Sequence, residues 1–217
     1  GLVGRVDYFS EFARFETDND QPNNAYRIKT YAGRFGAAVA QNTYLSATIR
    51  WLDKFYASPN GMSLFGTPDD AWQTGRMSSV GLSGQTQLSD RWIASGRLGL
   101  SVQRARFVNP TTSGTVFSGV GFGDVRTITG ANGYSATGRG VLDWGPYDSR
   151  SRGVRQGVYA QTTYQAGRHL SISGGGNYER EKAYTDPDGD PTTTRDNGTI
   201  WVEGRGSVLD RVSLTAG

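Results

Sequence analysis

Two short loops carry oxygen-rich side chains that could bind a hard metal ion. Asp18, Asn19 and Asp20 are consecutive, and three further carboxylates alternate in the sequence DPDGDP: Asp186, Asp188 and Asp190. Carboxylate and amide oxygens are the ligands that Ca2+ prefers, so either loop could hold calcium. The sequence favours polar turns at both places, because Asp and Asn bend chains without a metal. In DPDGDP, Pro191 also stands where an EF-hand loop needs glycine.

Groups that could perform catalysis are few. The chain contains no Cys and a single His, His169, which lies in a predicted tight turn. Glu179 and Glu181 share one face of a predicted strand and could act as an acid pair. With arginines close by, a charge network is the better interpretation. We therefore expect no enzymatic activity, no catalytic residue, and no cofactor beyond calcium in the loops.

Aromatic residues in the long loops are candidates for ligand binding. Large organic ligands bury against rings, and loops carry much of the binding function of a rigid scaffold. Packing within the loops is the alternative for each residue. The ligand-binding candidates are Tyr56, Phe65, Trp72, Phe117 and Phe122.

The elements that would position these residues are strands. From Trp92 to Val102 every even position is apolar or Gly, and the odd positions include Ser95, Arg97 and Ser101. This period of two predicts a strand with one apolar and one polar face. No helical spacing is found, and the same alternation recurs in residues 2–8, 31–39, 45–51, 80–88, 170–178 and 200–208.

Two kinds of connection alternate along the chain. Tight turns are predicted near Gln41, Ser89, Gly167 and Asp210. Short turns at one end of a sheet and long loops at the other are typical of outer-membrane barrels. The long connections are predicted at Glu16–Ala25, Tyr56–Trp72, Asn109–Ala131, Gly145–Gly153 and Ala183–Asn197.

The strand count is open in one region. Tyr134–Trp144 also alternates, so either it pairs with a further strand around Val116–Ile128 or one of the turns is misassigned. The sequence therefore predicts about nine to eleven strands.

The composition favours a membrane barrel over a soluble sandwich. No run of about 18 apolar residues is present, so no transmembrane helix is expected. The apolar faces carry few large side chains, because Gly and Ala stand between single large residues. Lipid fills gaps that a protein core could not leave empty. The net charge of +3 and the lack of a basic run argue against nucleic acid. Aromatic residues near strand ends are expected to form interfacial girdles: Trp51, Phe55, Tyr56, Trp92, Phe107, Trp144, Tyr178 and Tyr184.

The fold class predicted is therefore all-β, an antiparallel up-and-down transmembrane β-barrel, here a partial barrel. Arg34, Arg50, Arg97, Glu203 and Arg205 would stand on its polar face. The alternative is a soluble β-sandwich, such as a carbohydrate-binding module. That fold would bury Leu98, Leu100 and Val102 in a protein core.

Three segments resemble a known family. RFETDNDQPNNAYRIKTYAGRFG (14–36), VRTITGANGYSATGRGVLDW (125–144) and VYAQTTYQAGRHLSISGGGNYERE (158–181) are similar to the barrel region of TonB-dependent outer-membrane receptors. The similarity is greatest to the cobalamin-receptor-like branch. The resemblance implies a barrel of twenty-two strands with an N-terminal plug, in the outer membrane of a Gram-negative bacterium. It also implies import of a scarce small-molecule ligand, cobalamin or siderophore-iron, with energy from TonB, and some such receptors order their loops with Ca2+.

The chain departs from the family pattern. It has no plug sequence, about half of the strands needed to close the barrel, and no terminal aromatic after Thr215. We expect residues 1–217 to be part of one β-barrel domain, with the plug and the remaining strands absent, and to form an open sheet with two unpaired edges. The expected partners are outer-membrane lipid, TonB through the missing plug, and the ligand. A small porin-like outer-membrane barrel, closed by these residues alone, is the other alternative.

Overall fold

The computed structural model describes residues 1–21, 23–58, 70–110, 125–129, 133–139, 147–185, 189–208 and 212–216. These residues form strands and their connections. In this part of the chain there is no helix of the length and apolarity needed to cross a membrane.

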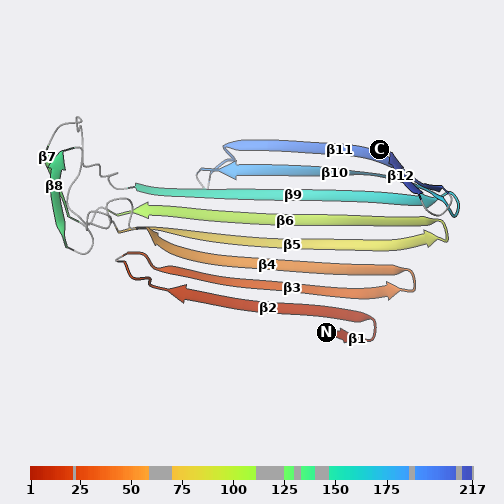
Figure 1. Cartoon of the computed structure of the whole chain (residues 1–217), viewed down its shortest axis with the longest axis horizontal. Helices are drawn as coiled ribbons and strands as arrows, with labels where there is room; N and C mark the ends of the chain where they lie inside the picture. The colour runs from red at the N-terminus through yellow and green to blue at the C-terminus, as the bar shows by residue number, and fades with distance from the viewer. Residues whose placement is uncertain are drawn as a thin grey trace.

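The main sheet is antiparallel throughout and contains ten strands in the order β1-β2-β3-β4-β5-β6-β9-β10-β11-β12 (Figure 1). Each strand pairs with its neighbour along the chain, apart from the step from β6 to β9, so the topology is up-and-down. The open order, with β1 and β12 at the edges, is that of a partial β-barrel and confirms the predicted fold class. The strands are β1 (Leu2–Val3), β2 (Val6–Thr17), β3 (Tyr26–Ala40), β4 (Thr43–Ser58), β5 (Ala71–Ser89), β6 (Trp92–Asn109), β9 (Tyr147–Gln165), β10 (Leu170–Tyr184), β11 (Thr193–Val208) and β12 (Val212–Ala216).

The ten strands of the main sheet lie within the predicted nine to eleven, and a two-stranded sheet accounts for the region that the sequence left open. β7 (Val125–Thr129) pairs with β8 (Ser135–Arg139) in a separate two-stranded sheet, while β6 pairs directly with β9. The first half of Tyr134–Trp144 thus has a strand partner, but it does not cross the main sheet. Figure 1 shows this hairpin beyond the long-loop end.

The connections are short at one end of the sheet and long at the other (Figure 1). Two residues join β3 to β4 and β5 to β6, and four join β9 to β10. The predicted long loop at Gly145–Gly153 is wrong, because β9 begins at Tyr147 and pairs with β6 up to Asn109. Its Gly, Pro and Ser content looked like a loop, but the partner strand supplies hydrogen bonds that local composition does not reveal.

The registers assign every paired side chain to one of two faces. Leu98 lies opposite Leu82 on β5 and Val158 on β9, and directly opposite residues share a face. We call this the apolar face. The other face, which we call the polar face, carries all five of the charged mid-strand residues predicted for it: Arg34, Arg50, Arg97, Glu203 and Arg205.

The described residues do not contain a packed hydrophobic core. Ala57 and Ala71 are the only buried apolar residues among them, whereas Leu98 is 53% exposed and Leu100 is 44% exposed. The sandwich alternative predicted these leucines in a protein core and is therefore wrong. No second sheet in the described part of the chain covers the apolar face. The described strands are held together by backbone hydrogen bonds and cross-strand contacts.

The aromatic residues divide between the two faces. Trp92 packs on Tyr164 at the tight-turn end of the apolar face, with ring centroids 4.8 Å apart. Trp51, Phe55 and Tyr184 also belong to this face, toward its long-loop end, as a girdle requires. Tyr178 is on the same face, but it pairs with Val158, the partner of Leu98, so it lies in the middle of the sheet and the girdle prediction is wrong for it. Tyr56 and Phe107 do not, because the register places both on the polar face. Trp144 lies outside the described residues.

Candidate functional site

Three strands supply a hydrogen-bonded cluster on the polar face near the tight-turn end. The Tyr44 hydroxyl donates to Asp7 Oδ2 at 2.6 Å, and Arg34 Nη2 donates to the Tyr44 oxygen at 2.7 Å. Arg34 Nη1 also lies 3.5 Å from Asp7 Oδ1. These contacts tie β2, β3 and β4 together through side chains, in addition to their backbone ladder.

Gly36 makes room for this cluster. A Cβ atom at this position would lie 1.9 Å from the Tyr44 hydroxyl and 2.5 Å from Asp7 Oδ2. Both distances are far below van der Waals contact, so any side chain at this position would displace Tyr44 or Asp7. The sequence therefore needs glycine here for close approach, which is one of the main uses of glycine in strands.

A second cluster lies on the polar face of β9, β10 and β11. Arg155 Nη2 is 2.5 Å from Glu179 Oε2, and Arg155 Nε is 3.6 Å from Glu181 Oε1. Arg195 Nη2 donates to Glu181 Oε2 at 2.6 Å. Glu179 and Glu181 are thus engaged with arginines from both neighbouring strands, as expected for a charge network and not for a free acid pair.

Neutral polar groups continue the polar face between these clusters. Ser46 and Ser83 hydroxyls are 2.7 Å apart, and those of Thr163 and Ser173 are 2.9 Å apart. The Arg97 guanidinium lies 5.8 Å from the centroid of the Tyr159 ring. The face therefore carries many hydrogen-bonding groups of the kind that line a water-filled lumen.

The single histidine is remote from the long loops. His169 lies in the turn between β9 and β10, with Nδ1 3.1 Å from Ser207 Oγ. This contact bridges the β9–β10 turn to β11. Its position at the tight-turn end matches the expectation from the sequence.

The structure places two of the five aromatic ligand candidates, and it does not bring them together. Tyr56 lies on the polar face, donates its hydroxyl to Gln73, and has Lys54 Nζ 5.7 Å from its ring. Trp72 lies on the apolar face, stacked on Phe55 with centroids 6.2 Å apart. Ligand binding stays a prediction for both, and Phe65, Phe117 and Phe122 lie outside the described residues.

Asp18, Asn19 and Asp20 form the exposed turn that follows β2. Asn19 adopts a left-handed backbone conformation with φ of 55°, and its amide donates to the Asn24 carbonyl. Asp18 Oδ1 lies 3.9 Å from Arg27 Nη2. Beside the turn, hydrogen bonding from Arg14 lowers the pKa of Glu16, so this carboxylate is charged at neutral pH. The turn is held by local hydrogen bonds, and calcium binding stays a prediction.

The second acidic loop is only partly described. Asp190 lies just before β11, whereas Asp186 and Asp188 lie outside the described residues. The base of this loop is closed by Thr185 and Thr192, whose hydroxyls are 2.9 Å apart. Within the described part of the chain, no three His, Cys, Asp or Glu side chains are grouped as a metal site would require.

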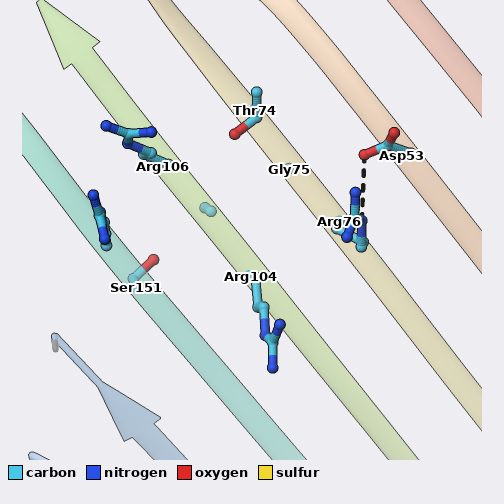
Figure 2. A pocket seen from close by; sticks show the side chains of 9 residues that line it. Asp53, Thr74, Gly75, Arg76, Arg104, Arg106 and Ser151 are labelled. Carbon is cyan, nitrogen blue, oxygen red and sulfur yellow. Dashed lines mark ion pairs between the residues drawn. The ribbon is translucent and has the colours of Figure 1, made fainter. Parts of the chain in front are cut away.

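The sequence analysis missed a group of arginines on the apolar face. Beyond Val102 the even positions of β6 continue as Arg104 and Arg106, so the face stays the same while its polarity reverses. Arg76, Arg104, Arg106 and Arg150 line a shallow cavity of about 480 Å³ across β5, β6 and β9, shown in Figure 2. Continuing the even-position pattern four residues past Val102 would have found Arg104 and Arg106, whereas Arg76 and Arg150 become their neighbours only through the register.

Asp148 is the carboxylate beside this cavity. Arg106 donates to both of its oxygens, from Nε at 3.0 Å and from Nη2 at 2.7 Å. This bidentate hydrogen bonding, with a further contribution from Arg150, lowers the pKa of Asp148 below its ordinary value. Asp148 is therefore fully ionised at neutral pH.

Comparisons with known proteins give a likeness in fold. No protein-family model matches the chain, and no curated protein matches it. Among solved structures, the chain is similar to the one named "Copper transporter OprC", with 12% sequence identity and a TM-score of 0.52. The alignment covers 94% of this chain and 32% of that chain, so the chain spans about a third of that structure's length. At this identity the likeness supports the fold, an antiparallel up-and-down sheet.

Proposed function

We propose that residues 1–217 are part of the wall of a TonB-dependent transport barrel in the outer membrane of a Gram-negative bacterium. The apolar face would contact lipid, and the polar face would line the lumen through which a ligand passes. The observation that carries this proposal is the apolar band on one face of the sheet, exposed and limited by charges at its long-loop end.

The height of this band matches a bilayer. On β6 it runs from Trp92 to Val102 and is followed by Arg104. Ten residues at about 3.3 Å each cover about 33 Å, which a strand tilt of about 40° reduces to about 25 Å. Outer-membrane barrels carry an apolar band of about 25 Å, and a soluble protein would not leave such a band uncovered.

The polar face supports a transport role. Its two ion-pair clusters hold carboxylates against arginines, and serine, threonine and glutamine fill the space between them. Charged side chains inside a membrane protein face the interior of a barrel or a water-filled cavity. Such a wall can pass a hydrated ligand along hydrogen-bonding groups without binding it tightly.

The donor atoms of the chain indicate which class of ligand to propose. The similar solved structure is named a copper transporter, but residues 1–217 contain no Cys, one His and two Met, and copper favours these soft donors. We therefore favour a larger ligand, cobalamin or a siderophore-iron complex, bound by loop aromatics. The plug and the remaining strands of the barrel, and with them TonB binding, would lie in other parts of the protein. We propose no enzymatic role.

Uptake by cells tests the proposal. The gene for the full-length protein would be deleted and restored in its own bacterium, with and without a functional TonB protein. Cells would be given radiolabelled cobalamin, an iron-siderophore complex, or copper. The proposal predicts uptake of one of the first two that requires both the protein and TonB. Uptake of all three without TonB would indicate a porin and would contradict the proposal.

A further inference from the structure

Five arginines gather on the apolar face just beyond the apolar band. They project from three neighbouring strands: Arg76 from β5, Arg104 and Arg106 from β6, and Arg150 and Arg152 from β9. We call this group the arginine cluster. Figure 2 shows Arg76, Arg104 and Arg106 on adjacent strands around the cavity, with the ion pair from Arg76 to Asp53 at its edge.

Like charges stand directly opposite one another in this cluster. Arg104 is the cross-strand partner of both Arg76 and Arg152, and Arg106 is the partner of Arg150. Side chains in such pairs start about 5 Å apart, and like charges at this spacing destabilise a sheet. An arrangement that repeats this repulsion three times requires a compensating anion.

The carboxylates beside the cluster do not neutralise it. Asp53 Oδ1 lies 3.6 Å from Arg76, and Asp148 is shared between Arg106 and Arg150. Arg104 makes no ion pair with any residue that the structure describes. Arg152 stacks on the ring of Tyr184, and its buried Nε has no hydrogen-bond partner in the same part of the chain. Among the residues that the structure describes, the five positive charges of the cluster thus have two carboxylates beside them.

The cluster stands at the height of lipid headgroups. Arg104 follows Val102, the last apolar residue of the band on β6, by two positions. This places its Cα about 5 Å above the band, after about 3.3 Å per residue and the tilt are taken into account. The headgroup region of a bilayer is about 5–8 Å deep on each side, so guanidinium groups here would lie among headgroups.

A second hollow lies on the apolar band, separated from the cluster cavity by the row of Ser78, Val102 and Val154. It has a volume of about 550 Å³ and lies over β5, β6, β9 and β10. Its lining is mostly apolar, with Val80, Leu98, Leu100 and Val158, and it also includes Gln156 and Arg180. Leu100 lies four residues from Arg104 on β6, and Val80 lies four residues from Arg76 on β5, so the two hollows are the same distance apart along both strands. A cationic cavity above an apolar groove on the same strands is complementary to a molecule with an anionic head and a hydrocarbon chain.

We propose that the arginine cluster binds the phosphate group of a phosphorylated membrane lipid, with an acyl chain of that lipid in the groove over Leu98 and Leu100. Arginine suits this ligand because its forked donors match phosphate oxygens. The Thr74 hydroxyl lines the same cavity and supplies another donor. The inference rests on the proposed function, since it needs the apolar face to meet lipid.

Binding would be measured on the full-length protein in neutral maltoside micelles by native mass spectrometry. The probes are dioleoyl phosphatidic acid, dioleoylglycerol, which has the same chains without phosphate, and glycerol 3-phosphate, which has the phosphate without chains. The test variant is Arg76→Gln/Arg104→Gln. The matched control, Arg50→Gln/Arg97→Gln, removes the same charge from the polar face.

The proposal predicts that phosphatidic acid binds at least about tenfold more tightly than either other probe, because each of these lacks one of the two recognised parts. The test variant should lose about tenfold or more in affinity, while the control variant keeps the wild-type affinity. Equal binding of dioleoylglycerol would show recognition of chains alone and would overturn the proposal. Equal binding of glycerol 3-phosphate would assign the site to a soluble anion and would also overturn it.

Thermal unfolding separates ligand binding from a structural role. Without lipid, Arg104→Gln should keep or raise the melting temperature, because it removes repulsion from Arg76 and Arg152. With phosphatidic acid, the wild type should gain more in melting temperature than the variant. A lower melting temperature of Arg104→Gln without lipid, with an unchanged response to the lipid, would overturn the proposal in favour of a structural role.

The two proposals can fail separately. If phosphatidic acid does not bind while Leu98 is found against lipid in the membrane, the lipid site is refuted and the barrel stands. If the lipid binds but cells show no TonB-dependent uptake, the transport function fails and the lipid site stands.

Discussion

A charged side chain at position 98 should reduce the stability of the protein most strongly if the apolar face contacts lipid. Leu98 lies six residues after Trp92 and four before Val102, so about 15 Å of membrane height separates it from one end of the band and about 10 Å from the other. Leu98 is thus near the middle of the band, and so near the midplane of the hydrocarbon layer that the band would span. Its cross-strand partners, Leu82 and Val158, are apolar and offer an arginine no ion pair.

Leu98→Arg should therefore cost about 2–4 kcal/mol of folding free energy, the range for arginine at the midplane of a barrel's lipid face. This is a change of about 30- to 1,000-fold in the folding equilibrium. The matched control is Ser95→Arg on the polar face of the same strand, opposite Gln85 and Gln161. In a water-filled lumen this control should cost less than about 0.5 kcal/mol.

The assay is urea unfolding of the full-length protein in phosphatidylcholine vesicles, followed by tryptophan fluorescence. A third variant, Leu98→Phe, separates lipid from a protein core. Lipid accepts the larger ring at almost no cost, whereas overpacking a core costs about 1–3 kcal/mol. The reasoning is refuted if Leu98→Arg costs no more than Ser95→Arg, or if Leu98→Phe is strongly destabilising.

Three further predictions concern other parts of the sheet. Gly36→Ala should destabilise the protein by about 1–3 kcal/mol, because its Cβ would overlap the Tyr44–Asp7 hydrogen bond. The control is Gly99→Ala, whose Cβ would meet no atom within 4 Å. Equal unfolding midpoints of the two variants would refute the clash. The carboxyl pKa of Asp148, measured by 13C NMR, should lie below 3.8 and rise toward that value in Arg106→Gln. Its stabilising contribution is thus complete at neutral pH and is lost as pH falls through the lowered pKa; a titration unchanged by Arg106→Gln would contradict this. Ca2+ should bind the Asp18–Asp20 turn only in the range of about 0.1–1 mM, because the Asn19 side-chain oxygen already accepts a hydrogen bond from the Thr17 hydroxyl. Calorimetry with Asp18→Asn/Asp20→Asn tests this, and micromolar binding lost in that variant would contradict it.

Much of the sheet could be predicted from alternation alone. The period of two in 92–102 fixes both the strand and its faces, because a shift of one residue would turn Leu98 and Leu100 to the polar face. The tight turns near Gln41, Ser89 and Gly167 follow from the points where alternation breaks and small polar residues appear. These signals are local, so no partner strand is needed to recognise them.

The predictions from the sequence were wrong where strand pairing, and not local composition, determines the structure. Gly145–Gly153 has the composition of a loop, yet residues 147–153 are strand because β6 extends alongside to Asn109. Trp72 pairs with Ala57, the neighbour of Tyr56, so Trp72 and Tyr56 lie on opposite faces of the sheet. Composition does not encode this cross-strand register. The arginine cluster was missed because its members come from three strands and become neighbours only once the register is known.

The most direct test of the account is to find which face of β6 meets lipid. Residues 1–217 contain no Cys, so single Cys residues can be placed at Leu98, Leu100, Arg97 and Ser101 in the full-length protein in outer membranes. Each variant is then labelled with a lipid-restricted reagent and with a water-soluble one. The account predicts lipid labelling at Leu98 and Leu100 and aqueous labelling at Arg97 and Ser101. Resistance of Leu98 and Leu100 to both reagents would place them in a protein core and would contradict the membrane barrel.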